Sequence, residues 1–262
     1  MSRDEPSTLP DPEEPASGIP RMVPGHKWIR AMIDGQVVLD ARAFTFVWEI
    51  PYWPTWFFRP EDLNGELQES SDAPRGHGDL AGAQRYDFHI AGRVLAGAVK
   101  RYPDSPSEQL RELVAIDFSA VDRWFEEDIE VFVHPRSPFT RVDALASSRH
   151  VVVSIDGVVL AESDKPTMLF ETGAPSRHYL PMTDVNMSLL EPSTTQSSCP
   201  YKGDARFWSV SIDGRVEQDI AWSYRTPTPE ATPIAGLVCF YDEKVDVDVD
   251  GVRQPRPESH FA

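Results

Sequence analysis

The stretch HVVVSIDGVVL, residues 150–160, consists of two apolar, β-branched runs joined at Ile155-Asp156-Gly157. Asp-Gly between apolar runs is among the strongest short-range signals for a β-hairpin. The same tripeptide occurs earlier as Ile33-Asp34-Gly35, so the two copies lie 122 residues apart (155 − 33). The sequence therefore predicts the same hairpin twice.

Identical residues recur at this offset far beyond the two hairpins. A register without gaps over such a length is hard to obtain by chance, so we infer that a domain was duplicated. The identical pairs are Thr45 and Thr167, Glu49 and Glu171, Asp62 and Asp184, Asn64 and Asn186, Leu67 and Leu189, Glu69 and Glu191, Gly92-Arg93-Val94 and Gly214-Arg215-Val216, and Tyr102 and Tyr224.

Each copy is expected to consist mainly of strands. Phe207–Val216 repeats the hairpin pattern, and residues 245–249 alternate valine with aspartate, as in a strand with one solvated face. In the first copy, Ile129, Val131 and Val133 are expected to form the matching last strand.

The connections between strands are expected to differ between the copies. Ser105-Pro106-Ser107-Glu108 resembles a capping box, and apolar residues from Leu110 to Trp124 follow at roughly helical spacing. These features predict a longer helical connection in the first copy. The second copy is expected to have only a short helical turn near Pro229–Ala235.

These patterns set the expected domain limits. We expect a first, divergent repeat domain at 27–135 and a second at 148–252. Residues 1–25 are too polar and proline-rich to bury much surface, which predicts a disordered tail, and 253–262 are expected to be a loose end. The expected fold class is mainly β, with two tandem small β-sheet domains and short helices.

The composition narrows the class of protein. A net charge of −17 argues against broad electrostatic contact with nucleic acid or anionic lipid. No apolar run approaches the ~18 residues of a membrane span, and the N-terminus lacks the apolar stretch of a signal peptide. We therefore expect an acidic cytoplasmic protein with neither nucleic acid nor a membrane as a partner.

The metal-ligating residue types form no recognisable site. Two cysteines, Cys199 and Cys239, are too few for a disulfide framework or a four-cysteine zinc site, and the histidines are dispersed. Asp246-Val247-Asp248 opens like a calcium loop, but its valines favour a strand. We expect no metal and no cofactor.

Cys199-Pro200-Tyr201-Lys202-Gly203 is the most distinctive chemical motif. A lysine three residues after a cysteine, in a turn bounded by proline and glycine, suits thiolate stabilisation and nucleophilic catalysis. The alternative is a cysteine packed for structure beside a solvated lysine. Glu171, which ends the apolar strand 167–170, is the candidate general base, with a strand-end charge facing water as its alternative.

Several residues of the second copy are expected to bind substrate around this turn. Trp222 and Tyr224 combine aromatic rings with polar tips that suit a planar ligand, although ordinary core packing is the alternative. The full expected set is His178, Tyr179, Tyr201, Trp222 and Tyr224.

The first copy lacks the distinctive turn. His77 and Leu80 stand where Cys199 and Lys202 stand in the second copy, whereas the glutamate and tyrosine partners of Glu171 and Tyr224 are kept. This pattern predicts one working and one degenerate site. The aromatic run YWPTWFF, residues 52–58, suits a pocket wall or a domain interface, and we expect an interface.

Six motifs mark the second half: LFET at 169–172, YLP at 179–181, LLEP at 189–192, CPYKG at 199–203, AWSY at 221–224 and IAGLV at 234–238. With them the chain closely resembles the bacterial family catalogued as domain of unknown function 427, also filed under a nucleotidyltransferase-like name. The resemblance implies a small β domain similar to the folded-sheet arrangement of Mss4-like proteins. It implies no zinc, because paired cysteines are absent here, and it brings no established activity.

Three functional hypotheses follow. The first is an enzyme in which Cys199 attacks an electrophilic carbon of a small molecule, in a hydrolase or transferase reaction assisted by Lys202 and Glu171. The second is a small-molecule binding module without turnover, and the third is an interaction protein. We expect a monomer whose halves pack with approximate two-fold symmetry, with a homodimer as the alternative.

Overall fold

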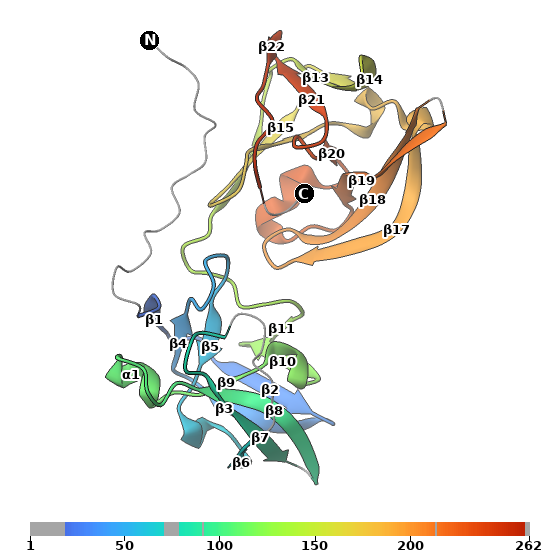
Figure 1. Cartoon of the computed structure of the whole chain (residues 1–262). Coiled ribbons are helices and arrows are strands. Elements are labelled where there is room, and N and C mark those ends of the chain that lie inside the picture. Colours follow the sequence, from blue (N-terminus) through green and yellow to red (C-terminus); the bar gives the residue numbers. More distant parts are fainter. Residues whose placement is uncertain (1–18, 71–78, 91, 213, 260–262) are drawn as a thin grey trace. The chain divides into compact units, whose positions relative to one another are not determined.

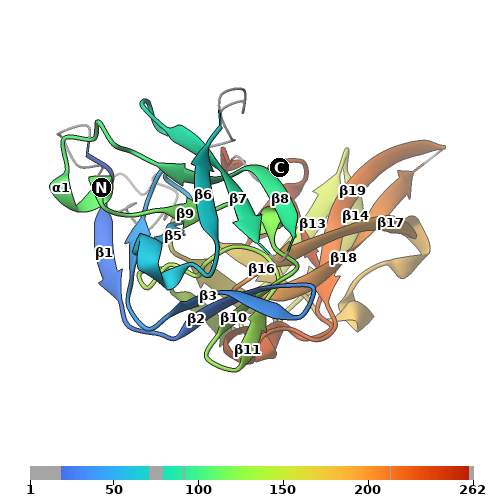
Figure 2. The same ribbon diagram turned by 90° about the horizontal axis from the view of Figure 1, so that it is seen from below.

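The computed structural model describes residues 19–70, 79–90, 92–212 and 214–259. It divides into two compact domains, with the boundary between Ser137 and Pro138. Each domain contains one three-stranded and two four-stranded sheets (Figures 1 and 2). The prediction of a mainly β chain with two small tandem domains is confirmed.

The first domain combines the sheets β1–β4–β5, β11–β10–β2–β3 and β6–β7–β8–β9. Its single α-helix, α1, spans Glu108–Arg111, and 3₁₀ turns lie at Pro60–Asp62 and Phe118–Ala120. The strands are β1 (Met22–Gly25), β2 (Ile29–Ile33), β3 (Gln36–Ala41), β4 (Phe44–Val47), β5 (Thr55–Phe57), β6 (Glu66–Glu69), β7 (Gln84–Ile90), β8 (Arg93–Arg101), β9 (Ala115–Ile116), β10 (Arg123–Glu126) and β11 (Ile129–Val131).

The second domain repeats this arrangement as β12–β15–β16, β14–β13–β21–β22 and β17–β18–β19–β20. Its 3₁₀ turns lie at Met182–Asp184, Met187–Leu189 and Pro229–Ile234. The strands are β12 (Val142–Ala146), β13 (Val151–Ile155), β14 (Val158–Ser163), β15 (Thr167–Glu171), β16 (Arg177–Tyr179), β17 (Leu190–Cys199), β18 (Gly203–Ile212), β19 (Arg215–Tyr224), β20 (Cys239–Phe240), β21 (Asp246–Val249) and β22 (Val252–Arg253).

The Asp-Gly hairpins have the local geometry that their sequence predicts. Asp34 and Asp156 adopt φ angles of 48° and 49°, and the glycines that follow them are also at positive φ. Such angles strain most side chains, but aspartate and glycine tolerate them. The β2–β3 and β13–β14 pairings both shift register at the same place, between Ala31 and Met32 and between Val153 and Ser154.

Each domain has an ion pair at the same position, between its Asp-Gly hairpin and the next sheet. Arg93 lies 2.9 Å from Asp34, and at the same offset Arg215 lies 3.1 Å from Asp156. All four side chains are largely exposed, so solvent screens the attraction within each pair. The pairs therefore document the shared register of the two domains rather than a source of stability.

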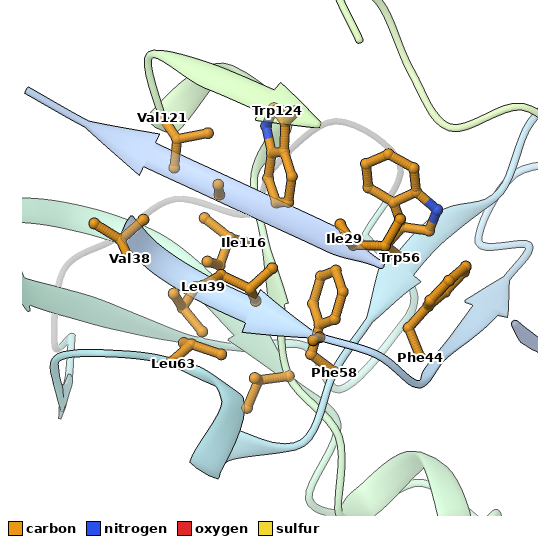
Figure 3. Packing of buried hydrophobic residues seen from close by; sticks show 14 of the residues in the cluster. Ile29, Val38, Leu39, Phe44, Trp56, Phe58, Leu63, Ile116, Val121 and Trp124 are labelled. Carbon is orange, nitrogen blue, oxygen red and sulfur yellow. The ribbon is translucent and has the colours of Figure 1, made fainter. Parts of the chain in front are cut away.

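The aromatic run 52–58 belongs to the core of its own domain, which corrects the expected interface. Trp56 and Phe58 pack with Phe44 and Trp124 in the cluster shown in Figure 3, and Phe57 is fully buried. Strand β5 inserts the run between the sheets, because β5 pairs with β4 through Thr45, Phe46 and Val47. The start of the run differs, since Tyr52 is 50 % exposed.

The predicted long helix of the first domain is also wrong. The helix α1 has a single turn, capped by Ser107 and not by Ser105: the Ser107 hydroxyl accepts a hydrogen bond from the Leu110 amide at 3.3 Å. The chain then returns to β structure, because Val114 pairs with Phe58 and Ala115–Ile116 pair with β8. Trp124 lies in strand β10. The apolar spacing reflected burial between sheets and not helical periodicity.

The last strand of the first domain lies earlier in the chain than expected. β10, and not 129–133, pairs with β2 as β21 pairs with β13, and Ile129–Val131 form the return strand β11. In the first domain, Trp124 of β10 is buried against Trp56. The alternating valines of β21 therefore have no matching valines in β10.

Both expected loose ends carry structure where they are described. The tail expected at 1–25 lies outside the described residues up to 18, but Met22–Gly25 form β1 and pair with β4. β12 likewise precedes the expected start of the second domain at 148 and pairs with β15. At the other end, Arg253 pairs with Asp248 at 3.0 Å, and residues 260–262 lie outside the described part. Within the described ranges no helix is long and apolar enough to span a membrane.

Replacing Trp56 with alanine tests the assignment of the aromatic run to the core. Removing a 2 % exposed ring is expected to lower the free energy of unfolding by about 3–5 kcal/mol, measured by urea denaturation. Tyr52→Ala in the same run is the control and should cost less than about 1 kcal/mol, because that ring is half exposed. Equal effects of the two substitutions would contradict the assignment.

Candidate functional site

Lys202 and Glu171 form an ion pair that is largely shielded from solvent. Glu171 is the last residue of β15, and Lys202 lies in the turn between β17 and β18. The lysine ammonium contacts the glutamate Oε2, and the two side chains are only 13 % and 14 % exposed. The structure therefore brings together two residues that lie 31 positions apart in the chain.

The turn that presents Lys202 is fixed by backbone contacts. The Lys202 amide donates to the Cys199 carbonyl at 3.3 Å, and the Thr228 amide donates to the Lys202 carbonyl at 3.2 Å. Gly203 has a φ of 99°, and a Cβ atom there would lie 3.1 Å from the Thr226 carbonyl oxygen. Glycine is required both by this angle and by the close approach, so the motif's last residue shapes the turn.

Cys199 completes a three-residue cluster with this pair. Its side chain is half-buried and lies near Lys202. Burial by itself would lower the pKa of Lys202, but the neighbouring groups, Glu171 foremost, outweigh it and raise that pKa above its usual value. The lysine therefore stays protonated and donates to the carboxylate of Glu171.

Tyr224 is the fourth member of the cluster. It lies at the end of β19 and is almost fully buried. Burial, followed by the nearby charges of Cys199 and Glu171, raises the pKa of its phenol far above the usual value. Its hydroxyl therefore remains neutral at any physiological pH and keeps its proton available for donation.

The other expected substrate-binding residues lie around this cluster in different roles. Tyr179 is fully buried and accepts a hydrogen bond of 3.1 Å from the indole of Trp222, and both rings are packed in a hydrophobic core cluster, as the core alternative for Trp222 expected. His178 points to Asp242, with 3.1 Å between Nδ1 and Oδ2, and both are buried. Tyr201 is half-buried in the turn, and its carbonyl accepts from the Thr228 hydroxyl at 2.5 Å.

Sequence reasoning missed a second buried ion pair, which lies beside Trp222. Arg177 makes two hydrogen bonds of 2.7 Å to Glu243, and its guanidinium lies over the rings of Trp222 and Tyr241. Cys239 lies close to this arginine, and complete burial raises the pKa of its thiol well above the usual value. No local pattern could have indicated the pair, because its partners are 66 residues apart.

The first domain contains its own cation at the glutamate, although the sequence did not indicate it. Glu49 contacts Tyr102 and lies 2.8 Å from Lys100. Lys100 comes from β8, where the second domain has Trp222, and not from the turn that holds Lys202. Leu80 donates its amide to the Tyr102 hydroxyl at 3.1 Å. His77, the counterpart of Cys199, lies outside the described residues.

Several residues near Glu49 are charged where the second domain has aromatic residues at the corresponding positions. In the first domain Lys100 also contacts Asp79 at 3.1 Å, and Arg85 contacts both Asp79 and Asp117. Asp117 corresponds to Tyr241, because the amide of Asp117 donates to the Ala98 carbonyl and the amide of Tyr241 donates to the carbonyl of Ile220, the counterpart of Ala98. Four charged residues thus occupy the positions of four aromatic ones: Asp79 for Tyr201, Arg85 for Phe207, Lys100 for Trp222 and Asp117 for Tyr241.

This exchange leaves the two sites chemically different. The charges of the first domain compensate one another in a closed network without a described nucleophile. In the second domain the rings of Phe207, Trp222 and Tyr241 pack on one another, and Arg177, paired with Glu243, lies over two of them. Among the described residues no group of three or more His, Cys, Asp or Glu side chains is arranged to hold a metal ion.

The comparisons with known proteins agree with the repeat. The family model described as Domain of unknown function (DUF427) matches residues 21–127 and again residues 143–251. The second match covers every residue of the cluster, and the first covers the charged network. No curated protein matches the chain.

Replacing Glu171 with glutamine tests how far the ion pair is shielded. The change leaves the ammonium of Lys202 without its carboxylate and is expected to lower the free energy of unfolding by about 3 kcal/mol, measured by urea denaturation. Adding Lys202→Met to Glu171→Gln should restore most of the loss, because an uncharged pair leaves no buried charge uncompensated. A single-variant cost below about 0.5 kcal/mol would instead indicate an ordinary surface pair.

Proposed function

The chain thus belongs to the DUF427 family in both halves, and we propose that its second domain is a small-molecule enzyme with Cys199 as nucleophile. The reaction class is acyl transfer, either to water in a hydrolase or to a second substrate in a transferase. The observation that carries the proposal is a half-buried thiol near a protonated lysine that itself contacts a carboxylate.

Each member of the cluster has a role in this reaction. The Cys199 sulfur forms a bond to the acyl carbon, and its proton passes to Glu171. Lys202 stabilises the thiolate before attack, and Tyr224 donates its proton toward the oxygen on which negative charge develops. The leaving group departs with the proton held by Glu171, and water or an acceptor then releases the acyl group from sulfur.

A second candidate is a binding module without turnover, and one observation favours it. Because Glu171 compensates the charge of Lys202, the cluster attracts an anion less than a free lysine would. The half-buried ring of Tyr201, in the same turn as Lys202, suits a planar ligand. For both candidates the partner is a small molecule, and we assign the protein to the cytoplasm because both its cysteines are free.

Thiol alkylation distinguishes a reactive cysteine from a structural one. Iodoacetamide at pH 6.5 should label Cys199 and leave Cys239 unmodified, because Cys239 is completely buried. Lys202→Met should slow the labelling of Cys199 by about tenfold, which corresponds to roughly 1.4 kcal/mol of lost thiolate stabilisation. Lys165→Met, which removes an exposed lysine of the same domain, is the control and should leave the rate unchanged. A rate unaffected by Lys202→Met would exclude the proposed activation.

Acylation of the enzyme tests the chemistry directly. With p-nitrophenyl acetate as the probe, wild-type protein should release p-nitrophenolate in a burst and gain one acetyl group on Cys199, detected by mass spectrometry. Cys199→Ser should abolish both signals while changing the free energy of unfolding by less than about 1 kcal/mol. Leu80→Lys in the first domain should alter neither. Binding of the probe without acetylation would favour the binding module.

A further inference from the structure

Strand β17 is a long strand at the edge of its sheet. It spans Leu190–Cys199, pairs with β18 on one side, and has no neighbouring strand on the other (Figure 1). Most of its residues are exposed. In the described part of the chain, the only backbone hydrogen bond that reaches it from outside β18 comes from the amide of Lys202. Its outer row of amides and carbonyls is therefore open.

Gln196–Cys199, the end of the strand next to the turn, lacks the charges, proline and bulge that usually protect such an edge. Natural proteins shorten exposed edge strands or place charges on them, because an open edge is a template for another chain. In the first domain the described part of the corresponding edge strand, β6, begins and ends with glutamate. In β17 no residue from Pro192 to Cys199 carries a charge, although the whole chain carries a net charge of −17.

The half of β17 next to the turn has the regular geometry that pairing requires. The register with β18 is interrupted between Pro192 and Gln196, where the hydroxyl of Thr195 is tied to Asp219 at 2.7 Å. Beyond this irregularity, Gln196–Cys199 pair with Gly203–Arg206 residue by residue. A bulge blocks pairing locally, so only the second half of the edge is straight enough for a partner strand.

We propose that this edge joins two copies of the chain, with the two β17 strands antiparallel about a two-fold axis. An antiparallel pair about such an axis keeps each side chain on its own face, so one residue must lie opposite itself. Ser197 and Ser198 are the two central choices within the straight half. Either choice places hydroxyl side chains opposite one another, which favours cross-strand hydrogen bonding.

Charge is the reason for choosing a second copy as the partner. Two molecules of the same strongly acidic protein repel one another over most of their surfaces. The uncharged segment from Pro192 to Cys199 is where they approach without placing like charges in opposition. The contact is short, so the dimer forms in a concentration-dependent way and not as an obligate assembly.

A cysteine at position 197 reports both candidate registers. If Ser197 lies opposite itself, Ser197→Cys places two thiols face to face; if Ser198 does, the new thiol faces the native Cys199 of the second copy. Opposite residues have Cβ atoms about 4.5–5.5 Å apart, within reach of a disulfide after small adjustments. Mild oxidation should therefore convert Ser197→Cys into a covalent dimer of twice the 29.4 kDa chain mass, measured without reductant. The double variant Ser197→Cys/Cys199→Ser distinguishes the registers.

Two further variants make the result decisive. Ser148→Cys, also exposed but outside β17, is the matched control and should not crosslink above the wild-type level. Ser197→Glu should reduce the dimer fraction seen by sedimentation of the wild type at high concentration by at least about tenfold, because it places like charges opposite one another. Equal crosslinking at 148 and 197, or a wild type that stays monomeric at every concentration, would overturn the proposal. These measurements read mass alone, and their outcome does not depend on whether Cys199 is catalytic.

Discussion

A buried carboxylate at the end of one strand is the constraint on which both domains are organised. Glu49 follows β4 and Glu171 ends β15, and each side chain is almost entirely removed from solvent. A carboxylate in such a place is unfavourable unless a cation and hydrogen-bond donors accompany it. Each domain supplies a lysine, and each places a tyrosine from the end of the β8 or β19 strand beside the carboxylate. The lysine belongs to β8 in the first domain and to the turn between β17 and β18 in the second. The remaining differences between the two sites follow from this difference.

When the lysine comes from β8, as Lys100 does, it occupies the position of a large ring and must itself be compensated. Asp79, Arg85 and Asp117 complete this compensation, and the first domain becomes a closed set of charges. When the lysine comes from the turn, as Lys202 does, the position on β19 is free for Trp222. The second domain then has aromatic rings where the first has charges, and a thiol lies next to the lysine.

The same duplication has produced different edges. β6 begins and ends with glutamate, whereas β17 has its charged residue, Glu191, near its start and is uncharged from Pro192 to Cys199. The strand that ends at Cys199 is also an edge strand of the second domain. The proposed contact and the proposed chemistry of the turn are separate properties of this strand.

The sequence by itself determined the repeat, the hairpins and the β class, because these depend on local signals: Asp-Gly turns, alternation, and identical residues at a fixed offset. It also identified Cys199, Lys202 and Glu171, since the turn motif and the strand end are visible in the chain. It misjudged the run 52–58 and the segment after α1, because apolar spacing alone does not distinguish a helix face or an interface from a strand buried between sheets. Only the tertiary structure revealed Lys100 at Glu49 and Arg177 at Glu243. These partners lie far apart in the chain, and the pairing of strands, not any local pattern, brings their charges together.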